Sequence, residues 1–143
     1  MGAERGDVAG QLGKHLEASP PSGLVSAYVF GSHAEGRAHR ESDIDVGILL
    51  AHEAHPAPRD RFEVRVQLAA SLPAPLGGAA VDIVVLNDAP PLLGRHIVTT
   101  GQRVFCADDG LDHAFVRDVQ LRAADLEPFL CRMRRLKLEA LAR

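Results

Sequence analysis

Three short apolar runs constrain the fold of this chain more than any other feature. They are Leu24–Phe30, Asp43–Leu50 and Ala80–Leu86, and each is rich in residues that favour β-strands. Stretches with the apolar spacing of helices precede, separate or follow these runs. Strands combined with helices in this way predict an α/β (α+β) protein built on one small β-sheet.

The remaining elements are expected around these three strands. A short edge strand is predicted near Arg103–Cys106. Proline is common at the first position of a helix, so Pro128 favours a new helix at that residue rather than the continuation of an earlier one. The expected helices are Gly2–Ala18, Asp60–Leu72, Pro90–Thr100, Leu111–Ala124 and Pro128–Ala142. The chain of 143 residues is long enough for a single domain with its own core.

Composition excludes several classes of function. The net charge is -3 and aromatic residues make up 4% of the chain, so neither a basic field nor a base-stacking platform for nucleic acid is expected. No apolar run reaches the ~18–20 residues that cross a bilayer, and the polar N-terminus is unlike a signal peptide. Cys106 and Cys131 are far apart and form no CxxC pair. Two lone thiols are typical of a cytoplasmic protein, and the cytoplasm is the expected location.

A Gly-Ser pair follows the first predicted strand directly. Gly31 and Ser32 stand where a strand turns into the next segment. A glycine lets the backbone approach a ligand closely, and free N–H groups at such a junction bind phosphate. The same pair also fits a simple glycine turn with a serine cap. Gly31 and Ser32 are therefore candidate phosphate-binding residues.

Three aspartates stand on the second and third predicted strands. Asp43 and Asp45 are two residues apart, so a strand conformation puts both carboxylates on one face. Asp82 interrupts an otherwise apolar strand and needs a partner, either an arginine or a cation. If the two strands are neighbours, all three carboxylates can hold Mg²⁺, which prefers oxygen ligands. Two such ions would clamp the attacking and leaving oxygens of a phosphoryl transfer.

The joint pattern is far more specific than its parts. Gly-Ser, ten residues and then Asp-x-Asp is expected by chance about once or twice in a thousand chains of this length. GSHAEGRAHRESDIDVGILL, followed by VDIVVLN, resembles the nucleotidyltransferases of the DNA polymerase β superfamily, and in particular the minimal nucleotidyltransferases (MNT). The resemblance covers about residues 22–108 and leaves residues 109–143 as additional C-terminal helices.

The resemblance implies a polymerase-β-like fold and a role for each motif residue. Gly31 and Ser32 would hold the triphosphate of ATP, and Asp43 and Asp45 would bind two Mg²⁺ ions. Asp82 would bind the catalytic ion and accept the proton of the incoming hydroxyl. In many relatives an Arg occupies the position of Glu35, and Arg37 stands two residues later in this chain.

A downstream segment narrows the resemblance further. APPLLGRHIVTTGQRVF is similar to MNT proteins encoded beside a HEPN partner. In such pairs the HEPN protein is an RNase toxin, and the MNT protein is an antitoxin that adds AMP to a toxin tyrosine. Two alternatives stay open: an antitoxin that acts by binding alone, and a transferase for a small molecule such as an aminoglycoside. A homodimer is also compatible with the sequence.

Overall fold

The computed structural model describes residues 7–31 and 43–142 of the chain. Its centre is a four-stranded sheet with the strand order β3-β2-β1-β4. The strands are β1 (Leu24–Phe30), β2 (Ile44–Leu50), β3 (Val81–Val85) and β4 (Gln102–Cys106). β1 pairs antiparallel with β2 and with β4, whereas β2 and β3 run parallel. The mixed sheet confirms the predicted α/β (α+β) class and places the fourth strand at one edge.

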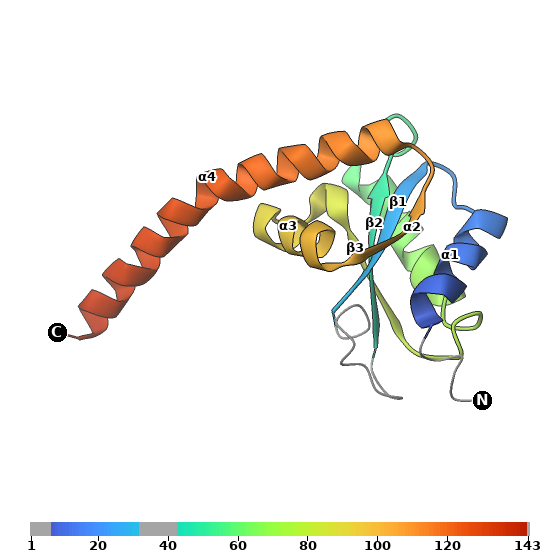
Figure 1. Ribbon diagram of the computed structural model, residues 1–143, viewed down its shortest axis with the longest axis horizontal. Helices are drawn as coiled ribbons and strands as arrows, with labels where there is room; N and C mark the ends of the chain where they lie inside the picture. Colours follow the sequence, from blue (N-terminus) through green and yellow to red (C-terminus); the bar gives the residue numbers. More distant parts are fainter. Residues whose placement is uncertain (1–6, 32–42, 143) are drawn as a thin grey trace.

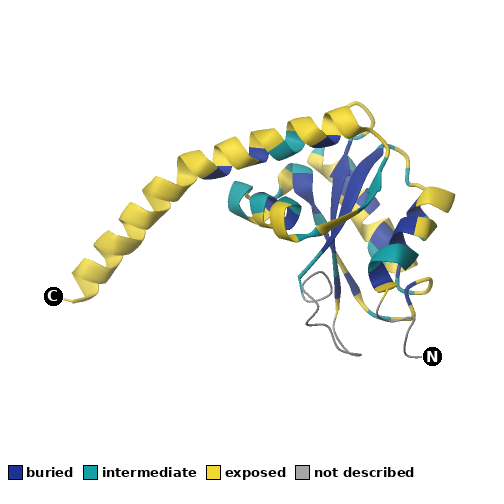
Figure 2. Cartoon of the chain, in the orientation of Figure 1, coloured by how far each residue is buried: buried dark blue, intermediate teal, exposed yellow. Residues whose placement is uncertain are grey.

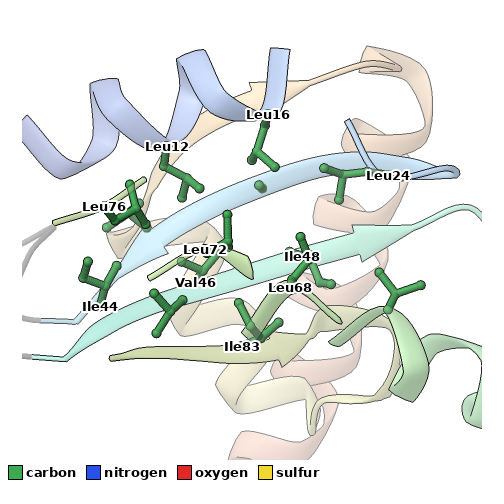
Figure 3. Packing of buried hydrophobic residues seen from close by; sticks show 14 of the residues in the cluster. Leu12, Leu16, Leu24, Ile44, Val46, Ile48, Leu68, Leu72, Leu76 and Ile83 are labelled. Carbon is green, nitrogen blue, oxygen red and sulfur yellow. The ribbon is translucent and has the colours of Figure 1, made fainter. Parts of the chain in front are cut away.

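Helices cover both faces of the sheet (Figure 1). On one face, α1 (Val8–Ala18) and α2 (Pro58–Ser71) pack on the inward side chains of β1, β2 and β3. Leu12 and Leu16 of α1 and Leu68 of α2 belong to one buried cluster with Val46 and Ile83, as Figure 3 shows. This large aliphatic cluster fixes which face of each strand is buried, because strand side chains alternate between the two faces.

The opposite face carries α3 (Pro91–Thr100) and the first half of α4 (Asp109–Leu141). Tyr28, Leu49 and Leu86 form its core together with Ile97 of α3. Between β3 and α3, a short 3₁₀ turn, η2 (Leu86–Asp88), places Asn87 against Leu50, where the two residues exchange two hydrogen bonds of 2.9 and 2.8 Å. This amide ties the end of β2 to the segment that leads into α3.

One long C-terminal helix replaces the two that the sequence predicts. α4 continues from Asp109 to Leu141 through Pro128, so the expected break between Leu111–Ala124 and Pro128–Ala142 is wrong. Pro128 follows the exposed Leu121 by two helical turns and so lies on the outward face. There the lost backbone hydrogen bond meets water, and helix-forming residues on both sides continue the helix. α4 is bent in Figure 1, with its concave side toward α3.

A buried polar cluster attaches α4 to the sheet. Asp112, which is 2% exposed, accepts hydrogen bonds from the hydroxyls of Ser26 and Tyr28 at 2.6 and 2.7 Å. Its second oxygen accepts a bond of 3.0 Å from Arg103 on β4. Burial and the bond to Asp112 raise the pKa of the Tyr28 phenol, so this group remains a donor throughout the physiological range. The cluster therefore joins β1, β4 and α4.

Candidate active site

The end of β1 and the starts of β2 and β3 lie next to one another at the same end of the sheet. β1 ends at Phe30, and the antiparallel register sets Phe30 opposite Asp45 near the start of β2. The parallel register then sets Asp45 opposite Asp82 near the start of β3. Residues paired across neighbouring strands lie about 5 Å apart and point to the same face. The structure therefore brings Asp45 and Asp82 together, as the motif predicts if the two strands are neighbours.

The face to which these two carboxylates point follows from strand alternation. Val46 and Ile83, the next residues on each strand, belong to the core under α1 and α2. Asp45 and Asp82 therefore point to the opposite face, on which α3 and α4 lie. Asp82 is exposed and Asp45 is partly buried. Both side chains are accessible to a ligand that approaches this edge.

Gly31 lies directly against Asp45. Its φ of +73° is in the left-handed region, and a Cβ atom at this position would collide with an Asp45 carboxylate oxygen. Both the conformation and the close approach require glycine here. The backbone at the end of β1 is consequently held beside the carboxylate, which is compatible with the predicted phosphate-binding role.

The other predicted site residues are less fully defined. Asp43 is exposed and comes one residue before β2 begins. Ser32 lies outside the described residues, as do Glu35 and Arg37. The roles proposed for these residues stay predictions.

The surroundings of the carboxylates bear on whether they can hold a metal ion. Asp82 forms no ion pair with an arginine among residues 7–31 and 43–142, so the salt-bridge explanation for this strand aspartate does not hold in that part of the chain. Within the same residues, no three His, Cys, Asp or Glu side chains are gathered closely enough to hold a metal ion. Carboxylate oxygens are the ligands that Mg²⁺ prefers, and the strand register places two carboxylates, those of Asp45 and Asp82, on one face.

The buried cluster around Asp112 was not predicted from the sequence. A signal for part of it was present, because Ser26 and Tyr28 are polar and two residues apart in an otherwise apolar strand. Their spacing puts both hydroxyls on one face and calls for a buried acceptor. Which of the 19 acidic residues supplies that acceptor depends on the tertiary structure.

Comparison with known proteins identifies the family. Residues 18–110 match the family model described as polymerase beta, nucleotidyltransferase. The chain therefore belongs to the polymerase β nucleotidyltransferase family, and the match agrees closely with the range of about 22–108 expected from the motifs.

Individual relatives give a more detailed comparison. The protein adenylyltransferase MntA of Shewanella oneidensis is 35% identical over 82 residues, which are 57% of this chain and 54% of the relative. The chain thus matches about half the length of this curated relative. A toxin–antitoxin solved with AMP-PNP is 26% identical, with a TM-score of 0.65, over 94% of this chain and 98% of that chain.

A further solved structure supports the fold. It is the tri-AMPylated Shewanella oneidensis HEPN toxin in complex with MNT antitoxin, matched at 21% identity and a TM-score of 0.61. The match covers 96% of this chain and 99% of that chain. At this level of identity the likeness shows a shared fold, which extends over the C-terminal helix as well as the sheet.

Proposed function

We propose that this protein transfers AMP from ATP to a hydroxyl of a partner protein, a tyrosine of a HEPN-type RNase toxin, and thereby acts as its antitoxin. The observation that carries the proposal is the register that sets Asp45 opposite Asp82, with Gly31 against Asp45. The proposed substrate and partner are based on the relatives, since one is a protein adenylyltransferase and another is a toxin–antitoxin with an ATP analogue.

The aspartates at this end of the sheet suit the metal chemistry of such a transfer. Asp43 and Asp45 would hold two Mg²⁺ ions, and Asp82 would share the catalytic one. Bound there, Mg²⁺ neutralises charge on the triphosphate and lowers the pKa of the attacking hydroxyl. The backbone N–H groups around Gly31 and the Ser32 hydroxyl would donate hydrogen bonds to the phosphates.

The transfer balances without any further reactant. The acceptor oxygen forms a bond to the α-phosphorus of ATP, and the bond from that phosphorus to the bridging oxygen of the β-phosphate breaks. Pyrophosphate leaves with the electron pair, while Asp82 takes the proton of the acceptor hydroxyl. Positioning of the two reactants accounts for most of the rate, because phosphoryl transfer requires little covalent work from the protein.

The same proposal sets the location and the other partners. The cytoplasm is the proposed location, because it supplies ATP and a newly made toxin. None of the described helices is long and apolar enough to cross a membrane. No direct contact with nucleic acid is proposed, because the chain carries a net charge of -3. A homodimer is compatible with this function but is not required by it.

Intact mass measurement of the partner tests the proposal. The protein is incubated with ATP, Mg²⁺ and the HEPN-type partner that the proposal predicts to be encoded by the neighbouring gene. The proposal predicts a gain of one or more AMP masses on the partner. An unchanged mass in a complex that nevertheless forms would favour an antitoxin that acts by binding alone. Transfer to an aminoglycoside but not to the protein would favour the small-molecule alternative.

A further inference from the structure

The C-terminal part of α4 projects from the body of the protein. Ala123 is the last buried residue of this helix, and every described side chain from 124 to 142 is exposed. We call residues 124–142 the arm. Figure 2 shows it as a continuous exposed segment that leaves the body beyond α3. The body therefore supports only the first half of α4.

The surface of the arm has the pattern of a helix face that packs against another element. Its large apolar side chains recur at intervals of three and four residues, the spacing of one helix face. Leu126 and Leu130 follow the buried Val119 and Ala123 by two turns, so they continue the side of α4 that packs on the body. These residues, which we call the stripe, are 38–54% exposed: Leu126, Phe129, Leu130, Met133 and Leu136.

An uncovered stripe of this size is unusual on an isolated domain. Scattered single apolar residues are normal on a surface, but contiguous ones mark a site for another protein. In addition, a helix segment without packing is only marginally stable in water, and Pro128 weakens this one further. Both properties indicate that another element covers the arm in the functional state.

A groove between the arm and α3 extends this surface. It has a volume of about 440 Å³, and its lining includes Leu92 and His96 of α3 and Leu130 and Cys131 of the arm. A 2.7 Å ion pair between Arg95 and Glu127 joins the two helices across it. The groove lies beside the stripe and can receive side chains of a helix docked there.

The charges of the arm indicate which occupant it fits. Beyond Pro128 the arm carries Arg132, Arg134, Arg135 and Lys137 against Glu139 alone. Before Pro128 the arm also carries Asp125 and Glu127, of which Glu127 is paired with Arg95, so only the part beyond Pro128 is basic. Two arms laid parallel to each other would set Arg132 near Lys137 in that basic part. A partner with acidic side chains is attracted instead.

We propose that the stripe and the adjoining groove bind one helix of the partner protein, a helix whose apolar face is bordered by acidic side chains. The identity of that partner as the substrate rests on the proposed function. α3 and α4 cover the face of the sheet to which Asp45 and Asp82 point. A partner docked on the arm therefore lies on the same side of the sheet as the two carboxylates.

The helix itself provides a matched control for a binding experiment. Met133 lies in the stripe and is 48% exposed, whereas Leu121 is 61% exposed and points outward from the same helix. Met133→Glu and Leu121→Glu each add one carboxylate to a solvent-exposed apolar position of α4. Titration calorimetry with the HEPN-type protein, without ATP, measures binding separately from transfer. Circular dichroism melting confirms that both variants remain folded.

We expect Met133→Glu to weaken binding at least about tenfold, because hot-spot residues dominate an interface. Leu121→Glu should bind within about twofold of the unchanged protein, and so should Asp82→Asn, which alters only the transfer site. Equal binding by the Met133 and Leu121 variants overturns the docking surface, as does an unchanged protein that does not bind. Intact binding without AMP transfer would instead contradict the proposed function and leave the docking surface supported.

The two cysteines offer a second measurement of the same contact. Cys131 lines the groove and is exposed, whereas Cys106 is partly buried and outside it. Burial and a hydrogen bond to Asp109 raise the pKa of the Cys106 thiol, which slows its alkylation and makes it an internal reference. We expect the bound partner to slow alkylation of Cys131 relative to Cys106. An unchanged ratio of the two rates would show that the groove stays open.

Discussion

At the scale of single residues, the candidate site depends on three residues that are far apart in the sequence and close together in the fold. Gly31 directly follows β1, whereas Asp45 and Asp82 lie on β2 and β3, and the strand registers bring the three residues to one end of the sheet. This arrangement could be predicted from sequence because each aspartate is flanked by apolar residues that must face the core. That β2 and β3 are parallel neighbours could not be predicted from spacing, since it depends on how the whole sheet assembles.

Replacement of either strand aspartate tests the transfer site most simply. We expect Asp45→Asn and Asp82→Asn each to lower the rate of AMP transfer by at least about a thousandfold, because a neutral amide neither neutralises the cation nor accepts the proton. Initial rates of AMP incorporation measure this effect, and circular dichroism checks the fold. A variant that retains the full rate would remove that residue from the site.

Gly31 is expected to be intolerant of any side chain. Gly31→Ala places a Cβ atom in a left-handed backbone and against the carboxylate of Asp45. We expect weaker binding of Mg²⁺-ATP in titration calorimetry and a loss of stability of about 1 kcal/mol or more. Gly77 also has a positive φ, but a Cβ atom there would meet no described atom within 4 Å, so Gly77→Ala is a matched control. Equal ATP affinity in the two variants would contradict the role of Gly31.

Asp112 and Tyr28 differ in what their removal leaves behind. Tyr28→Phe removes one donor from a carboxylate that keeps two others, so we expect a loss of about 1 kcal/mol in the free energy of unfolding. Asp112→Ala leaves two buried hydroxyls without their acceptor and leaves Arg103 with only its 3.4 Å ion pair to Asp109, and we expect a loss on the order of 3 kcal/mol. Urea unfolding measures both values. Similar losses in the two variants would show that the cluster contributes little as a unit.

At the scale of elements, α4 shows the limits of a local signal. Pro128 is a common first residue of a helix, and the sequence alone favours a break there. The structure continues the helix because Pro128 falls on the solvent face, where the lost hydrogen bond is tolerated and strong helix formers surround it. Which face of the helix Pro128 occupies depends on tertiary packing, so the length of this helix is harder to predict than the buried face of each strand.

Replacement of Pro128 tests both the continuity of α4 and the contribution of its bend to partner binding. We expect Pro128→Ala to raise the helix content and the thermal stability of the arm, since proline costs up to about 3 kcal/mol inside a helix. A straighter arm would also point away from the position that the bent helix reaches, so binding of the HEPN-type partner should weaken. Circular dichroism and calorimetry measure the two effects. A loss of helix content would contradict a continuous α4.

At the scale of the whole molecule, the proposed transfer site and the proposed docking surface lie on one side of the sheet. Asp45 and Asp82 point to the face that α3 and α4 cover, and the arm extends from the same layer (Figure 1). The Asp112 cluster fixes the direction in which α4 leaves the sheet, so it orients the arm relative to the carboxylates. The fold thus places the proposed docking surface and the proposed transfer site on the same side of the sheet.

The position of the transferred phosphate tests the central claim most directly. The protein and its HEPN-type partner are incubated with Mg²⁺ and with ATP labelled at either the α- or the γ-phosphate, and label on the partner is counted. We expect incorporation from α-labelled ATP alone, with release of labelled pyrophosphate from the γ-labelled form. Asp82→Asn should give no incorporation under the same conditions. Label retained from the γ-phosphate, or equal incorporation by Asp82→Asn, would contradict adenylyl transfer at this site.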